Sequence, residues 1–286
     1  MSKSAVIGKY DKSSKVVKIA ESLQERENKI HLTGLFGSSL SFVTASLFGK
    51  NDLPFLLILN DKEEAAYYLN DLEQLVGSQD VLFYPGSYRR PYQLEDTDNA
   101  NVLLRAEVLN RINSRKKPAI IVSYPEALFE KVVTRKELEK NTLKVPVGDK
   151  ISIEFINEVL FEYEFKRVDF ITEPGEFSVR GGIIDVFSFS NDNPYRIEFF
   201  GNEVDSIRSF DVETQLSIEK QSKITIIPNV ENQFFEENRE SFLQYISEKT
   251  IIFIQDTDGL LSKLDKLFQK AAEAFESLNA TVKHLK

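Results

Sequence analysis

The stretch GLFGSSLS, residues 34–41, has the residue types of a loop that binds the phosphates of a nucleotide. It follows a short apolar stretch, IHLT (30–33), and precedes an amphipathic run, FVTASLF (42–48). A strand, a glycine-bearing turn and a helix start, in that order, frame the phosphate-binding pattern G-x-x-x-x-G-K-[ST]. We therefore expect this frame around the loop.

The chemistry of the pattern is incomplete. Gly34 takes the first glycine position, Ser39 the second, Leu40 the lysine position and Ser41 the hydroxyl position. In a working loop the lysine contacts the β and γ phosphates and the hydroxyl binds magnesium, and a leucine cannot replace that cation. We predict a degenerate loop without a cofactor, in which Gly34 and Gly37 allow a tight turn and Leu40 packs into the core.

Other reactive constellations are scarce. The chain has no cysteine and two histidines, His31 and His284, which excludes disulfides and thiolate zinc sites and leaves little for a histidine-based metal site or triad. Glu173 and Glu176 have no nucleophile beside them. A basic stretch, RRPY (89–92), is a possible nucleic-acid contact, but acidic residues follow it at once and the net charge is −9. Because phosphate binding needs a surplus of Lys and Arg, direct DNA binding is disfavoured.

The bulk properties describe a globular chain of about two domains. It has 286 residues, of which 42% are hydrophobic and 28% charged. No apolar run approaches the roughly 20 residues that cross a bilayer. The N-terminus lacks the apolar core of a signal peptide, so we expect a cytoplasmic protein.

The first 130 residues alternate between strand and helix patterns. Residues 55–60, 81–85 and 119–124 are apolar on both faces, which is typical of buried parallel strands. Residues 61–76 and 100–113 carry apolar residues at helical spacing. This alternation predicts a parallel sheet covered by helices.

The pattern changes near residue 143. Ser152 is a plausible N-cap of a helix, and residues 177–218 contain four strand patterns joined by short turns, which favours antiparallel hairpins. A strand at 250–256 and a following helix then return. The predicted fold class is α/β, a degenerate P-loop-type parallel sheet domain interrupted by an inserted β-rich α+β domain. Its predicted parts are 1–132 and 214–286 for the α/β domain and 133–213 for the insertion.

One long motif points to a family. Residues 173–217 contain E-x-G-E-F-x-x-R-G-x-x-I-D-x-F, then R-x-E-F-F and F-D, and the upstream stretches YPGSYRRPY (84–92) and SYPEALF (123–129) fit the same module. This pattern resembles the N-terminal UvrB-homology module of the transcription-repair coupling factors (Mfd), and also the excision-repair protein UvrB. The resemblance covers nearly the whole chain.

Two departures favour the coupling factors over UvrB. UvrB-like proteins keep the loop lysine, which is Leu40 here, and they carry a long aromatic hairpin for DNA that has no counterpart between Tyr84 and Arg111. The motor and RNA-polymerase-binding parts of a coupling factor are absent from these residues.

The resemblance implies a non-catalytic module. Its β-rich domain is expected to bind UvrA and so to recruit the repair machinery to a stalled polymerase, while RNA polymerase and DNA are contacted by other parts of the full-length protein. The family also keeps this surface covered by distant C-terminal elements until it is needed. The alternative is a diverged nucleotide-binding or nucleotide-hydrolysing domain.

The resemblance also implies contact residues. The family uses arginines before and inside the motif, plus a phenylalanine. Arg180 and Phe187 match the motif directly, whereas the earlier arginine falls at Lys166 or Arg167, and both remain open. Asp185 lies between the matched positions, and Arg196 and Arg208 are secondary candidates.

Strand alternation in IIDVFSF (183–189) bears on the exposure of the phenylalanine. It puts Ile184 and Val186 on one face and Asp185 and Phe187 on the other. If the first face meets the core, Phe187 is partly exposed beside a carboxylate. The alternative is that Phe187 is core and the arginines are solvated.

Overall fold

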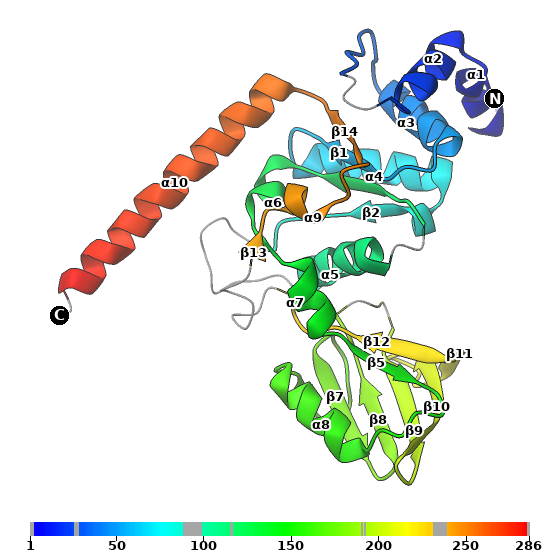
Figure 1. The fold of residues 1–286 in the computed structure, drawn as a ribbon, viewed down its shortest axis with the longest axis vertical. Coiled ribbons are helices and arrows are strands. Elements are labelled where there is room, and N and C mark those ends of the chain that lie inside the picture. The colour runs from blue at the N-terminus through cyan, green and yellow to red at the C-terminus, as the bar shows by residue number, and fades with distance from the viewer. Residues whose placement is uncertain are drawn as a thin grey trace. The chain divides into compact units, whose positions relative to one another are not determined.

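The computed structural model describes residues 3–25, 29–87, 99–114, 117–189, 191, 193–230 and 239–284 (Figure 1). The chain forms two compact units. The first comprises Met1–Leu94, Ser114–Glu130 and Ser241–Lys286, and the second Glu95–Asn113 and Lys131–Glu240. The basic stretch 89–92 and the acidic residues after it lie outside the described residues.

The first unit is built on a four-stranded parallel sheet of order β14-β1-β3-β2. Its strands are β1 (Phe55–Ile58), β2 (Val81–Phe83), β3 (Ile120–Ser123) and β14 (Ile251–Ile254). Every residue of β1 and β3 is buried. The prediction of apolar, two-sided strands in a parallel sheet is therefore confirmed.

Helices and one short 3-10 turn complete this unit. They are α1 (Lys3–Asp11), α2 (Ser14–Ser22), α3 (Ser39–Lys50), α4 (Lys62–Val76), η1 (Ser78–Asp80), α6 (Pro125–Phe129), α9 (Phe242–Tyr245) and α10 (Thr257–His284). Asp61 caps α4 by accepting a hydrogen bond from the Glu64 amide at 2.8 Å. No helix within the described ranges combines the length and apolarity needed to span a membrane.

The second unit contains a six-stranded sheet of order β11-β10-β9-β8-β7-β6. Neighbouring strands in this sheet pair antiparallel, except β6 and β7, which pair in parallel. The strands are β6 (Lys166–Arg167), β7 (Glu176–Arg180), β8 (Ile183–Val186), β9 (Tyr195–Phe200), β10 (Glu203–Phe210) and β11 (Ser217–Gln221). The sheet thus continues past residue 213.

The remaining elements of this unit are α5 (Asn99–Ser114), α7 (Arg135–Lys140) and α8 (Ile153–Glu162), with two small antiparallel pairs, β5 (Leu143–Pro146) with β12 (Lys223–Ile226) and β4 (Val132–Val133) with β13 (Arg239–Glu240). The Ser152 hydroxyl caps α8 by accepting from the Phe155 amide at 3.1 Å, as predicted. α8 packs on β7, where the rings of Phe161 and Phe177 meet edge to face at 5.2 Å.

The predicted fold class, an α/β part with a parallel sheet and a separate β-rich part, is confirmed. One local expectation is wrong, because residues 30–33 do not form a strand before the glycine-bearing loop. Only Ile30 and Leu32 are apolar there, and Ile30 is exposed. Two apolar residues do not supply the buried run that a central parallel strand requires.

Candidate functional site

The glycine-bearing loop keeps the turn but not the phosphate chemistry. Gly34 and Gly37 have positive φ angles of 77° and 55°, and α3 begins two residues later. The Ser41 hydroxyl donates to Asp71 Oδ2 at 3.1 Å, so the group that would bind magnesium is already engaged by α4. Leu40 is half-buried rather than in the core. A carboxylate beside the loop, with no cation at position 40, disfavours a phosphate there.

Tyr68 adds a second link between α4 and the loop. Its hydroxyl points to the Gly37 carbonyl at 3.5 Å. Burial raises the pKa of Tyr68, and the nearby Glu64 and Asp71 raise it further, so the phenol stays a neutral donor. The loop is therefore held by α4 as part of the fold.

The E-x-G-E-F motif builds the loop between β6 and β7. A Cβ at Gly175, whose φ is 89°, would lie 2.6 Å from Cζ of Phe189, so only glycine fits. The buried Glu176 carboxylate accepts hydrogen bonds from the Thr172 amide at 2.8 Å, the Thr172 hydroxyl at 3.0 Å and the Glu173 amide at 3.2 Å. The glycine and the glutamate thus fix the conformation of this loop.

Polar residues form a row across the six-stranded sheet. Asp185 lies opposite Ser178 on one side and Arg196 on the other. Arg196 lies opposite Arg208, which lies opposite Lys220. Since directly paired residues share a face, these side chains mark one polar face, which we call the polar sheet face.

Asp185 is the centre of a charge cluster on the polar sheet face. Its side chain is only 1% exposed, and it pairs with the Arg180 guanidinium and with Arg196 through Nε at 2.7 Å and Nη2 at 2.9 Å. The Arg180 side chain is 43% exposed and that of Arg196 19%. The hydrogen bond to Asp185 raises the pKa of Arg196. A buried carboxylate with two guanidinium partners is compensated, and it fixes both cations in place.

Both arginines also contact aromatic rings. The Arg196 guanidinium lies 4.4 Å from the ring centroid of Phe210, and its Nη2 donates to Gln215 at 3.2 Å. The Arg180 guanidinium lies 5.4 Å from the ring of Phe170, which is 66% exposed. No sequence pattern predicts a role for Phe170, because the residue lies in the loop after β6, where strand alternation assigns no face.

The expectation that Phe187 is partly exposed is wrong. Its side chain is 6% exposed and packs with Ile171 and Phe210, flanked by Val168 and Val212. The reason is that the sheet buries a second, small apolar cluster on its polar face, beyond the end of β8. Phe187 therefore contributes packing behind the charge cluster.

The register of β6 against β7 distinguishes Lys166 from Arg167, the two candidates for the family's earlier arginine. Lys166 and Arg167 are both exposed. Lys166 lies opposite Glu176, so it shares the polar sheet face with Arg180, whereas Arg167 lies opposite the buried Phe177. Lys166 is therefore the better placed of the two to act together with the cluster.

A second ion pair lies on the same face. Arg208 Nη2 is 2.5 Å from Glu198 Oε1, and the Ser206 hydroxyl donates to Glu198 Oε2 at 2.6 Å. Hydrogen bonds from Ser206 and Arg208 hold the pKa of the Glu198 carboxyl below its usual value.

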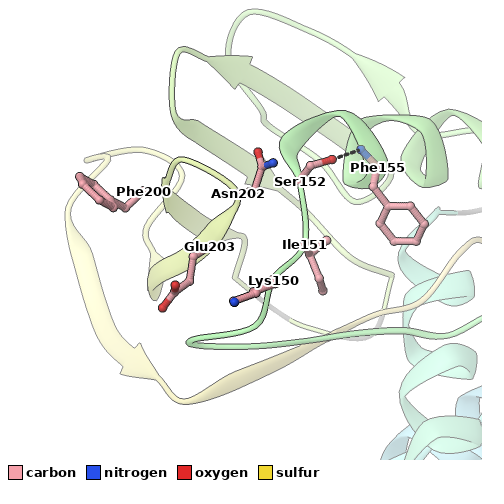
Figure 2. A pocket seen from close by; sticks show the side chains of 7 residues that line it. All are labelled: Lys150, Ile151, Ser152, Phe155, Phe200, Asn202 and Glu203. Atoms are coloured by element: carbon pink, nitrogen blue, oxygen red, sulfur yellow. Dashed lines mark hydrogen bonds between the residues drawn. The ribbon is translucent and has the colours of Figure 1, made fainter.

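A pocket of about 700 Å³ lies elsewhere in the second unit, where the loop before α8 approaches the turn between β9 and β10 (Figure 2). Its lining residues are Lys150, Ile151, Ser152, Phe155, Phe200, Asn202 and Glu203. Figure 2 shows the ring of Phe200 pointing away from the other labelled side chains. None of the predicted site residues lines it. Within the described part of the chain, no group of three or more His, Cys, Asp and Glu side chains is arranged to hold a metal ion.

The chain is similar to known proteins over nearly its whole length. Residues 143–232 match the model of the UvrB interaction domain. The chain is 32% identical over 267 residues, 93% of its length, to the transcription-repair-coupling factor of Bacillus subtilis (strain 168). It is 29% identical over 218 residues to that of Myxococcus xanthus and 27% identical over 172 residues to that of Haemophilus influenzae. It spans 22%, 18% and 15% of the length of these relatives, respectively. The chain therefore contains a UvrB interaction domain, and nearly all of its length is similar to part of the transcription-repair-coupling factors.

Proposed function

We propose that this chain is a non-catalytic recruitment module whose polar sheet face binds UvrA, and that it thereby couples stalled transcription to nucleotide excision repair. The observation that carries the proposal is the cluster of Arg180, Asp185 and Arg196, which lies inside the region matched by the UvrB interaction domain.

The cluster suits protein recognition. Arginine is enriched at interface hot spots, because a planar guanidinium offers several donors and stacks on rings. Arg180 and Arg196 are already oriented by a buried carboxylate, so less conformational entropy is lost when a partner binds. Lys166 extends the cationic surface along the same face. The partner is therefore expected to present carboxylates.

Catalysis has no support from the loop at residues 34–41. A nucleotide hydrolase would need a cation where Leu40 lies and a free hydroxyl at Ser41, whose donor is directed to Asp71. Contacts with RNA polymerase and DNA are assigned in this proposal to other parts of the longer relatives.

The test is a calorimetric titration of purified UvrA with the purified chain. We expect saturable binding that weakens as salt is raised, because exposed charge pairs across an interface are screened. A parallel titration with magnesium-ATP is expected to give no heat of binding. Absence of UvrA binding at low salt would overturn the proposal, and ATP binding would support a diverged nucleotide-binding domain instead.

A further inference from the structure

The Phe170 ring and the Arg180 guanidinium form one continuous piece of exposed surface. The ring is 66% exposed, and the guanidinium lies 5.4 Å from its centroid. An aromatic ring so exposed adds little to the core, whereas it offers a large apolar area to a partner. The cation over its face supplies N–H donors beside that area.

The ring projects from a loop that is fixed on both sides of it, and on the N-terminal side the Val168 amide donates to the Phe177 carbonyl at 2.9 Å. The next residue, Ile171, is 2% exposed and packs with Phe187 and Phe210. Two residues further, the backbone is held by the Glu176 carboxylate. The position of Phe170 is thus set before any partner arrives, which lowers the entropic cost of binding.

The Arg180 guanidinium is held in place by the buried Asp185. Arg180 Nη2 donates to Asp185, which also accepts two hydrogen bonds from Arg196. Asp185 is 1% exposed, so its carboxylate does not reach a partner. Its effect on a partner is exerted through the orientation of the two guanidinium groups.

We propose that Phe170 and Arg180 act as a single anchor for UvrA and that Asp185 is the positioning residue of this anchor. The inference rests on the proposed function, and it adds an aromatic contact and a buried support to that surface. The matching site on the partner is an apolar pocket with a carboxylate at its edge, because such a pocket accepts the ring and pairs with the guanidinium.

The test measures the affinity of UvrA for three single variants by calorimetric titration. Phe170→Ala removes the ring from an exposed site and Asp185→Asn removes the charge without changing the shape. Each is expected to weaken binding at least fivefold. Ser152→Ala removes the cap of α8 in the same unit, so it is expected to lower the thermal midpoint while changing the affinity less than twofold.

The double variant separates positioning from general destabilisation. If Asp185 acts by orienting the anchor, Phe170→Ala and Asp185→Asn together weaken binding by less than the product of their separate effects. If the two effects multiply in the double variant, or if Asp185→Asn binds UvrA with unchanged affinity, Asp185 does not position the anchor. Unchanged affinity of Phe170→Ala would remove the anchor. If the unaltered chain fails to bind UvrA, the proposed function fails rather than this inference alone.

Discussion

Asp185 and Glu198 lie on the same face of the six-stranded sheet, but burial gives them different roles. Asp185 is enclosed and shared by two arginines, so removing its charge leaves two cations without their common partner. Glu198 is partly exposed, and its pair with Arg208 is accessible to water. Such a pair contributes less to stability because solvent screens it.

The lowered pKa of Glu198 nevertheless predicts that the free energy of unfolding depends on pH. Its pKa is lowered in the folded state, first by the hydrogen bond from Ser206 and then by Arg208. The unfolded chain therefore takes up the proton first, and the stabilisation present above the ordinary carboxyl pKa of 4.5 is lost as the pH falls through the lowered value. We expect Glu198→Gln to lose less stability than the wild type between about pH 5 and pH 3, in urea unfolding at each pH. Equal losses in both proteins would contradict this assignment.

The loop between β6 and β7 carries Phe170, which belongs to the proposed binding surface. Few residue types fit the conformation of this loop. Gly175 and Gly181 both have positive φ angles, 89° and 58°, but only Gly175 has a neighbour where a Cβ would lie. Phe189 occupies that space, and its ring packs edge to face on Phe165 at 5.7 Å. A side chain at residue 175 must therefore displace a core ring.

The two glycines make a matched pair for measurement. Gly181→Ala adds only backbone strain, for which we expect a loss of about 1 kcal/mol in the free energy of unfolding. Gly175→Ala adds the clash with Phe189 as well, for which we expect about 2–4 kcal/mol in total. Chemical denaturation of both variants checks the difference. Equal losses would mean that the contact between Gly175 and Phe189 does not constrain the loop.

Periodicity predicted most of the elements, because burial repeats along a strand or helix. The strands at 55–58, 120–123 and 251–254 and the helix capped by Ser152 follow directly from the sequence. The strand predicted at residues 30–33 was wrong, because its two apolar residues resemble a strand pattern but do not fill buried positions.

The candidate site was less predictable than the fold, since its geometry depends on pairing across strands. The motif contains Arg180 and Arg196, but the register of β7, β8 and β9 is what brings both of them to Asp185. Strand alternation placed Phe187 correctly on the face of Asp185, yet it contains no information about the cluster with Ile171 and Phe210 that covers the ring. Phe170 lies in a loop, where no period applies.

The two units of the chain differ in the features that bear on the proposed function. The first unit keeps a parallel sheet and a glycine-bearing turn, but the loop has Leu40 at the lysine position of phosphate-binding loops, and its Ser41 hydroxyl donates to Asp71. The second unit carries the cluster of Arg180, Asp185 and Arg196 on a preformed scaffold. The chain covers 22% of the length of the Bacillus subtilis relative, and the function we propose for this part is recognition of a partner.

Reversing one charge on the polar sheet face, and one elsewhere in the same unit, tests whether this face binds UvrA. Arg180→Glu places a carboxylate at the exposed end of the cluster, whereas Lys223→Glu makes the same kind of change at an exposed lysine of β12. In calorimetric titrations with UvrA, we expect Arg180→Glu to weaken binding at least tenfold, about 1.4 kcal/mol, and Lys223→Glu to bind within about twofold of the wild type. Equal affinity of both variants for UvrA would contradict the assignment of the polar sheet face as the binding surface.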